Sequence, residues 1–429
     1  MKPEQAAAAA IRPSAVRGRN RGAARGALAL LLGLLLALVT ACSSGGSKSS
    51  DASGDKGGAD KGASQADKAA AQKTSDAVIS ITPKDGASNV PTRDALKVTV
   101  AKGKLTSVKV TSESGAAVAG ALAADGSSWT PADSLNTGVK YRVEAHAKDA
   151  KNLEAVENAT FTTLTPANTF IGYFNTEQGQ TYGVGMIVSL RFNKPIANRK
   201  DVLGHIKVTA NPAVDVVGHW VDGQRLDFRP KDYWAPGTQV TLGLRLNGVQ
   251  GSPGVYGVQS KDVKFSIGRS QVSLVDAEKH TMTVRKNGAV LRTIPISAGS
   301  PQNTTYNGRM VISEKYTETR MNGDSVGFKG EYDIKDVPHA MRLTTSGTFV
   351  HGNYWGRPGI FGAENTSHGC VGLRDAKGAK DPGTPGAWFF SHSLIGDVVE
   401  VVHSHDRTVD PFNGINGWNM DWSQWTAGS

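Results

Sequence analysis

The chain has 429 residues, which exceeds an ordinary single domain and is enough for two to four domains. Hydrophobic residues make up 39%, enough to bury a core, and the fifty glycines with few aromatics favour turn-rich β domains over long helices. The net charge of the whole chain is +10, and beyond residue 42 the charged residues are dispersed, without a block of Lys and Arg, so the pattern of a nucleic-acid-binding protein is missing.

Residues 1–41 have the features of an export signal. Six basic residues between Lys2 and Arg25 precede an uncharged run at 27–39, which is short for a membrane span and ends in small residues. These 41 residues carry six cations and one carboxylate, so their removal lowers the net charge from +10 to +5. An uncleaved membrane anchor is the alternative interpretation.

The end of this segment, Leu38-Val39-Thr40-Ala41-Cys42, resembles the lipobox of bacterial lipoproteins. The resemblance implies cleavage before Cys42 and attachment of lipid to its thiol and its new amino end. Several acyl chains on one residue hold a protein stably at a bilayer. We therefore expect anchoring at the extracytoplasmic face of the cell membrane, followed by a flexible linker at residues 42–75 that is rich in Ser, Gly, Ala, Lys and Asp.

Two successive β domains follow the linker, at residues 76–165 and 166–268. Short runs with strand character, such as those at 96–100 and 240–244, are separated by turn clusters that contain Gly, Asp and Pro. Strands at this spacing predict β-sandwiches of immunoglobulin size. No cysteine pair is available in either segment, so each sandwich would depend on packing alone.

A third β-rich domain is expected at residues 269–403. Asn287-Gly288 between two strand-like runs is a strong signal for a tight hairpin. Thr384-Pro385, followed by an apolar run, predicts a short helix that has a threonine cap and proline at its first position.

The last segment, residues 404–429, places three tryptophans at helical spacing: Trp418, Trp422 and Trp425. We expect this tail to pack on the third domain; a platform for carbohydrate is the alternative.

The chemistry of the chain centres on Cys370. If Cys42 carries lipid, Cys370 has no disulfide partner, and exported proteins rarely keep a lone thiol without a use. A cysteine nucleophile needs a base, and His368 and His351 precede Cys370 by two and nineteen residues. Gly369 allows a close turn whose backbone N–H groups can face a reacting carbonyl as an oxyanion hole.

Two motifs carry a family resemblance: Ser346-Gly347-Thr348-Phe349-Val350-His351-Gly352 and Thr366-Ser367-His368-Gly369-Cys370-Val371. Together they closely resemble the catalytic signature of L,D-transpeptidases with the YkuD-type fold. The whole arrangement is similar to the actinobacterial lipoprotein members. The predicted fold class is therefore mostly β, with two immunoglobulin-like β-sandwiches, a YkuD-type catalytic domain with a short helix, and the Trp-bearing tail.

The resemblance implies a reaction and a set of residues. Cys370 would attack the L-centre of a diamino acid in a tetrapeptide stem of peptidoglycan, release D-Ala, and pass the acyl group to an amine of a second stem as a 3→3 cross-link. No cofactor or metal is expected, and carbapenem-type β-lactams would acylate the thiol. The implied roles are His351 as proton donor and acceptor, His368 beside the nucleophile, Gly369 in the oxyanion hole, and substrate contacts from Tyr332, Ser346, Gly347, Gly352 and Ser367.

One position departs from the family pattern. Many members have Asn two residues after the nucleophile, where this chain has Gly372. That Asn often helps to bind the stem, so the local stem contacts of this chain are expected to differ, while Cys370 and His351 are retained.

Four alternatives remain open at this stage. Hydrolysis of the same acyl-enzyme would make the protein an L,D-carboxypeptidase. A papain-like peptidase usually has its Cys before its His, which is the reverse of the order here. A zinc site of His351, His368 and Cys370 has no obvious fourth ligand nearby. A non-catalytic wall-binding lipoprotein is the last alternative. The oligomeric state and the identity of the diamino acid are not predicted.

Overall fold

The computed structural model describes residues 74–428. The predicted export signal, the lipobox with Cys42 and nearly all of the linker lie outside the described residues. Within residues 74–428, no helix is long and apolar enough to cross a membrane. The described part of the chain is mostly β with a few short helices, which confirms the predicted fold class.

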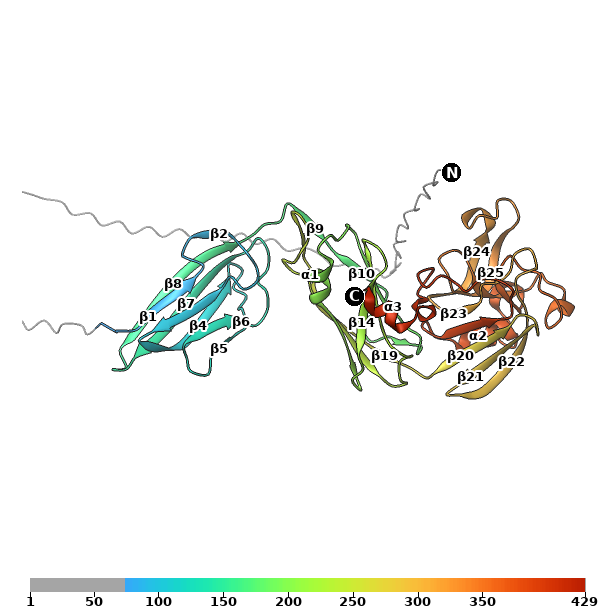
Figure 1. The fold of residues 1–429 in the computed structure, drawn as a ribbon, viewed down its shortest axis with the longest axis horizontal. Helices are drawn as coiled ribbons and strands as arrows, with labels where there is room; N and C mark the ends of the chain where they lie inside the picture. The colour runs from blue at the N-terminus through green and yellow to red at the C-terminus, as the bar shows by residue number, and fades with distance from the viewer. Residues whose placement is uncertain (1–73, 429) are drawn as a thin grey trace, which may run out of the picture. The chain divides into compact units, whose positions relative to one another are not determined.

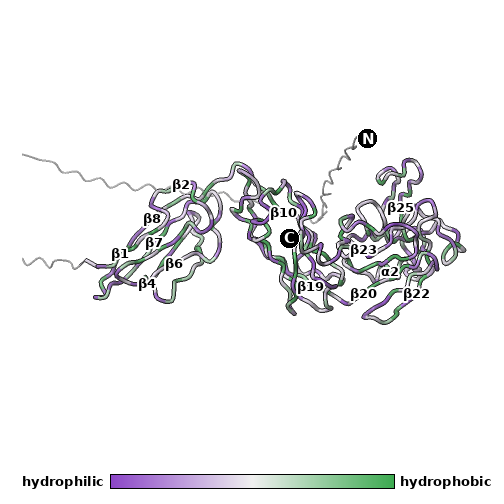
Figure 2. Tube along the Cα trace, viewed as in Figure 1, coloured by the Kyte–Doolittle hydropathy of each residue, from purple (hydrophilic) through white to green (hydrophobic). Residues whose placement is uncertain are grey.

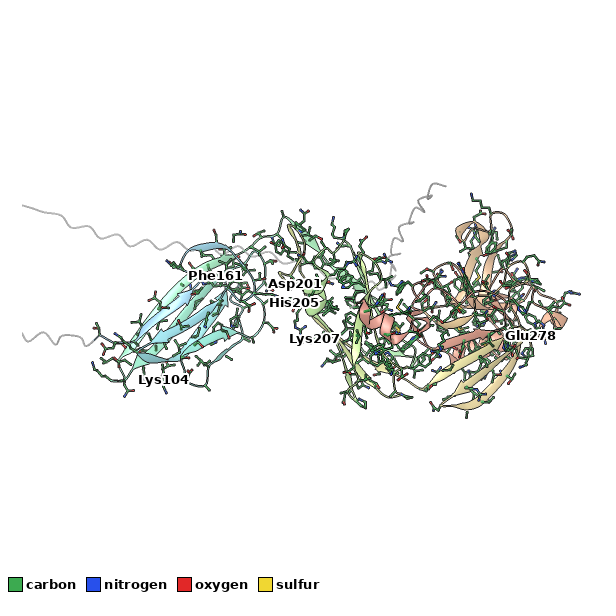
Figure 3. The ribbon with its side chains drawn as sticks, in the orientation of Figure 1. Lys104, Phe161, Asp201, His205, Lys207 and Glu278 are labelled. Carbon is green, nitrogen blue, oxygen red and sulfur yellow. The ribbon has the colours of Figure 1, made fainter. Side chains whose placement is uncertain are left out.

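The first sandwich consists of two four-stranded sheets with strand orders β1-β3-β6-β5 and β2-β8-β7-β4 (Figure 1). Hydrophobic and hydrophilic residues alternate along its strands (Figure 2), as expected where only one face of a sheet is buried. Phe161, labelled in Figure 3, is 1% exposed and stacks on Tyr141 in the core. The strands are β1 (Val78–Thr82), β2 (Ala87–Val90), β3 (Lys97–Ala101), β4 (Gly103–Ser112), β5 (Gly120–Leu122), β6 (Ser128–Pro131), β7 (Lys140–Asp149) and β8 (Glu154–Thr163).

The second sandwich has sheets of order β10-β12-β15-β14 and β11-β19-β16-β13, with a small third sheet of order β17-β18-β9. Its core includes the fully buried Phe170, Leu190 and Leu242. Its elements are β9 (Asn168–Phe170), β10 (Gly172–Phe174), β11 (Thr181–Tyr182), β12 (Val188–Phe192), α1 (Arg199–Gly204), β13 (Ile206–Asn211), β14 (Val216–Trp220), β15 (Arg225–Pro230), β16 (Gln239–Arg245), β17 (Gln250–Ser252), β18 (Val255–Gly257) and β19 (Ser260–Ile267).

The C-terminal domain is built on one nine-stranded sheet of order β23-β28-β20-β21-β22-β27-β26-β25-β24. Its elements are β20 (Gln271–Asp276), β21 (Thr281–Lys286), β22 (Ala289–Ser297), β23 (Gly308–Val311), β24 (Glu314–Asn322), η1 (Gly323–Ser325), β25 (Asp333–Arg342), β26 (Phe349–Asn353), η2 (Pro358–Ile360), β27 (Val371–Arg374), η3 (Lys377–Ala379), α2 (Pro385–His392), β28 (Val398–Val402), η4 (Gly417–Asn419) and α3 (Trp422–Ala427).

Two local predictions for this domain match the structure. Asn287 and Gly288 join β21 to β22 and both have positive φ, the backbone that a tight two-residue hairpin requires. Helix α2 begins at Pro385, and the Thr384 hydroxyl accepts a hydrogen bond from the Ala387 N–H.

The tail contacts two domains. Its tryptophans bind the second sandwich: Trp425 is fully buried and its Nε1 donates to the Val217 carbonyl, and Trp418 donates to the Gly185 carbonyl. Polar residues of the same tail, such as Asn416, bond to β23 and to the Leu343 carbonyl of the C-terminal domain.

The tryptophans contact the second sandwich because it contains a buried cation. The Arg229 guanidinium lies 4.5 to 5.2 Å from the ring centroids of Trp418, Trp422 and Trp425, and aromatic faces attract a cation. Because Trp418 and Trp425 are buried, they cannot form an exposed platform for carbohydrate.

Candidate active site

The candidate site lies on one face of two neighbouring parallel strands, β26 and β27, in which His351 pairs with Gly372. Side chains alternate between the faces of a sheet. Val350 and Val371 belong to the domain core, so the residues that flank them face the other way. His351 and Cys370 consequently share one face, and both line the same cavity.

Cys370 is almost buried, with 9% of its surface exposed. Its Sγ lies 3.4 Å from the Phe349 N–H and 3.6 Å from the Gly347 carbonyl. Burial raises the pKa of the thiol from 9.0 to about 11, against the smaller lowering by the Phe349 N–H. The resting group is therefore a neutral thiol that must lose its proton during any attack.

His351 is held in one tautomer. Its Nδ1 is 2.8 Å from the Gly352 carbonyl, which can only accept, so Nδ1 carries the proton and Nε2 is free to act as a base. Burial lowers the pKa of this imidazole below 6.5, against the opposing effects of the Gly352 carbonyl and Asp375. Trp355 stacks over the ring at 5.7 Å and is 42% exposed, at the mouth of the site.

Gly352 is fixed by a buried carboxylate behind the strand. A Cβ at this position would lie 2.1 Å from Asp375 Oδ2, so only glycine fits. Asp375 also accepts hydrogen bonds from His339 at 2.8 Å and from the Thr384 hydroxyl at 2.7 Å. Asp375 therefore bonds to the capping residue of α2 and also packs closely against the backbone of Gly352.

The turn before the thiol is locked by Ser367. Its hydroxyl donates to the Cys370 carbonyl at 2.6 Å and accepts from the Gly369 N–H at 3.2 Å. Gly369 has a φ of +106°, a backbone conformation that side chains disfavour. In this resting arrangement the Gly369 N–H is already engaged with Ser367.

A hairpin of β24 and β25 covers the other side of the turn. The His368 Nε2 lies 3.0 Å from a carboxylate oxygen of Glu331, and its ring contacts Tyr332 at 5.0 Å and Phe328 at 5.4 Å. His368 therefore contacts the hairpin rather than the thiol. Burial raises the pKa of Tyr332 to about 12, with a smaller contribution from Cys370, so its hydroxyl stays protonated as a donor.

Two cavities meet at His368. The first has a volume of about 160 Å³ and contains Cys370 and His351; it is lined by Met321, Tyr332, Ile334, His351, Asn353, Trp355, Thr366, Ser367, His368, Cys370 and Gly372. The second, of about 290 Å³, includes Ser346, Gly347 and Gly369 among its lining residues. The Ser346 hydroxyl is bonded to Asn413 of the tail.

The residues predicted from sequence line one or the other of these cavities, except Gly352, which lines neither and contacts His351 through its carbonyl. Four residues that line the first cavity were missed. Met321 and Ile334 come from the hairpin, which no local motif indicated. Asn353 and Trp355 follow His351 by two and four residues, so the alternation of strand β26 could have placed Asn353 on the same face as His351.

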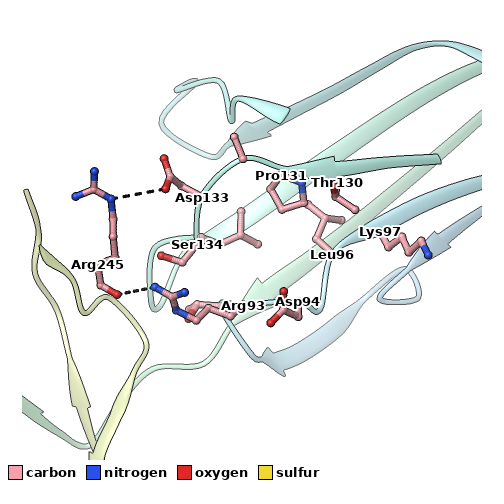
Figure 4. Close-up of a pocket in the computed structure, with 12 residues that line it drawn as sticks. Arg93, Asp94, Leu96, Lys97, Thr130, Pro131, Asp133, Ser134 and Arg245 are labelled. Carbon is pink, nitrogen blue, oxygen red and sulfur yellow. Dashed lines mark hydrogen bonds and ion pairs between the residues drawn. The ribbon is translucent and has the colours of Figure 1, made fainter. Parts of the chain in front are cut away.

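Other parts of the described chain offer less chemistry. A cavity of about 330 Å³ is lined by Arg93, Asp133 and Arg245 (Figure 4), where Arg93 donates to the Arg245 carbonyl and Arg245 and Asp133 form an ion pair at 3.8 Å. In residues 74–428 no three His, Cys, Asp or Glu side chains are grouped so that they could hold a metal ion.

Comparison with known proteins shows which family the chain belongs to. Residues 270–401 match the family model of the L,D-transpeptidase catalytic domain, and residues 87–250 match a bacterial Ig domain. L,D-transpeptidase 2 of Mycobacterium tuberculosis is 32% identical over 348 residues, which cover 80% of this chain and 83% of that protein. L,D-transpeptidase 5 of the same species is 28% identical and covers 80% of this chain and 75% of the relative.

These matches define an enzyme in which bacterial Ig-like domains precede a transpeptidase catalytic domain. The chain belongs to the L,D-transpeptidase family, whose members act on the peptidoglycan of the cell wall.

Proposed function

We propose that this enzyme forms 3→3 cross-links in peptidoglycan through a thioester on Cys370, with tetrapeptide stems as acyl donors. The observation that carries the proposal is the buried pair itself: a neutral thiol and a neutral imidazole share one cavity on adjacent strands. A cysteine beside a base is the arrangement required for acyl transfer.

In the first half-reaction, Cys370 Sγ attacks the carbonyl of the donor stem while its proton passes to Nε2 of His351. The tetrahedral oxyanion accepts hydrogen bonds from the Cys370 N–H, from the Gly369 N–H after it leaves Ser367, and from the Tyr332 hydroxyl. The C–N bond then breaks, and D-Ala leaves as an amine that takes the proton from His351.

In the second half-reaction, an amine of a neighbouring stem attacks the thioester and gives a proton to His351. The C–S bond breaks, and the proton returns to the Cys370 sulfur. The thioester retains the free energy of the cleaved peptide bond, so the cross-link needs no further activated molecule. Gly352 orients the imidazole, while Ser346, Gly347 and Ser367 shape the cavities that hold the two stems.

We further propose that the mature chain begins at a lipid-modified Cys42 on the extracytoplasmic face of the membrane. The residues that support this are the basic segment, the apolar run and the lipobox that ends at Cys42.

Intact-protein mass spectrometry with a carbapenem tests the thioester chemistry, because a strained lactam mimics the acyl donor. We expect one adduct on the wild type and none on Cys370→Ala. The absence of an adduct on the wild type, or an equal adduct on the variant, would contradict the proposal.

A further inference from the structure

We infer that Asn353 binds the donor stem through its side-chain amide and takes over a position that Gly372 leaves without a side chain. The inference rests on the proposed transpeptidation and assigns a substrate-positioning residue to it.

The strand places Asn353 in the row of site residues. Phe349, His351 and Asn353 occupy alternate positions of β26; Gly372 is the second residue of β27, and Cys370 directly precedes that strand. Asn353 is only 8% exposed, yet it lines the cavity that contains the thiol. A side-chain amide that lines a cavity can offer any polar atom that is not already bonded to a ligand in that cavity.

One end of this amide is already satisfied. Oδ1 accepts a hydrogen bond of 2.7 Å from the Gly356 N–H, and because that donor requires an oxygen, the amide has one orientation. Nδ2 has no hydrogen-bond partner within residues 74–428 and is left as a free donor in the cavity. An oxygen of the bound stem, either a peptide carbonyl or a carboxylate, would supply the missing acceptor.

Gly372 gives this amide its space. A Cβ built at Gly372 would lie 3.6 Å from Asn353 Nδ2 and 3.3 Å from the Ser297 carbonyl. A larger side chain at position 372 would therefore extend from the face of the sheet on which Asn353 lies, toward the region that the Asn353 amide occupies. The backbone of Gly372 does not have positive φ, so the position does not itself require glycine. A side-chain amide at either position 353 or position 372 would therefore reach the same region of the cavity.

The first experiment compares acyl-enzyme formation from a tetrapeptide-stem donor in the wild type, Asn353→Ala and Asn353→Asp. The aspartate variant keeps the acceptor for Gly356 but removes the donor. We expect kcat/KM to fall about tenfold in both, the scale of one hydrogen bond. Alkylation of Cys370 by iodoacetamide, which makes no stem contacts, should keep its wild-type rate. Asn158→Ala, on the exposed surface of β8, is the matched control.

The second experiment adds Gly372→Asn to Asn353→Ala. We expect this double variant to acylate faster than Asn353→Ala alone, because the amide returns from the neighbouring strand. A double variant that is no faster than the single one would overturn the inference.

The inference also fails if Asn353→Asp acylates at the wild-type rate, or if alkylation falls in parallel with acylation. In either case the wild-type enzyme would still form the acyl-enzyme, so the proposed function would stand. A wild type that forms no acyl-enzyme would instead overturn the proposed function.

Discussion

At the scale of single residues, the two histidines near Cys370 have different surroundings. His351 is buried, has one tautomer and lines only the cavity that holds the thiol, whereas His368 pairs with Glu331 on the covering hairpin and lines both cavities. His351 is therefore the better candidate for the base, and His368 is the better candidate for a residue that supports the hairpin.

Substitution of the two histidines should separate these roles. His351→Gln should lower the rate of acyl-enzyme formation by a factor of about 100 or more, the usual contribution of a general base. His368→Gln should lower it less, because Glu331 and His368 are partly exposed and such pairs contribute little. Stopped-flow acylation by a carbapenem would measure both. Equal losses would contradict the assignment.

The pH dependence of thiol reactivity tests the neutral resting pair. Because the pKa of Cys370 is raised to about 11, the thiolate fraction in the folded enzyme should still be rising at pH 9. We expect iodoacetamide alkylation to increase without a plateau between about pH 7 and about pH 10, whereas the urea-unfolded chain should level off near the ordinary value of a free thiol. A plateau in the folded enzyme near neutral pH would indicate a thiolate–imidazolium pair instead.

At the scale of elements, the parts of the site that local sequence could predict are those set by neighbouring residues. The tight hairpin at Asn287-Gly288 depends only on the backbone conformation of these two residues. The cap of α2 depends only on the hydrogen bond between Thr384 and Ala387. The hairpin of β24 and β25 has no such local signal, because its place over Cys370 depends on contacts between residues 36 or more positions apart, such as Glu331 with His368. Tyr332 could accordingly be aligned only loosely from sequence.

The tail is the clearest case of a long-range determinant. Its tryptophans have helical spacing, but nothing near them in the sequence predicts their contact with a buried arginine about 190 residues earlier in the chain. Asn416 and Asn419 add bonds to the C-terminal domain. The same segment thus contacts two domains, which no local pattern indicates.

Truncation of Trp425 should reveal this anchoring. Trp425→Ala removes a fully buried side chain, its bond to the Val217 carbonyl and a cation–π contact with Arg229, so we expect a loss of about 3–5 kcal/mol in unfolding free energy. Urea denaturation followed by circular dichroism would measure it. Gln424→Ala, one residue away and exposed, should change stability by less than about 0.5 kcal/mol. Similar values for the two variants would contradict the packing argument.

At the scale of the whole molecule, the order of segments suggests how the enzyme reaches its substrate. A lipid at Cys42, a polar linker and two sandwiches in series would carry the active site from the membrane toward the wall. Cys42→Ala should therefore abolish labelling by radioactive palmitate in cells and move the protein from the membrane fraction to the medium. Continued labelling of the variant would place the lipid elsewhere or refute the lipobox.

The most direct test of the central claim is incubation of the purified enzyme with muropeptides that have tetrapeptide stems, followed by mass spectrometry of the products. The account predicts dimers with 3→3 links and released D-Ala for the wild type, and neither product for Cys370→Ala. Tripeptide monomers alone would indicate a carboxypeptidase, and unchanged muropeptides a non-catalytic wall-binding protein; either result would contradict the account.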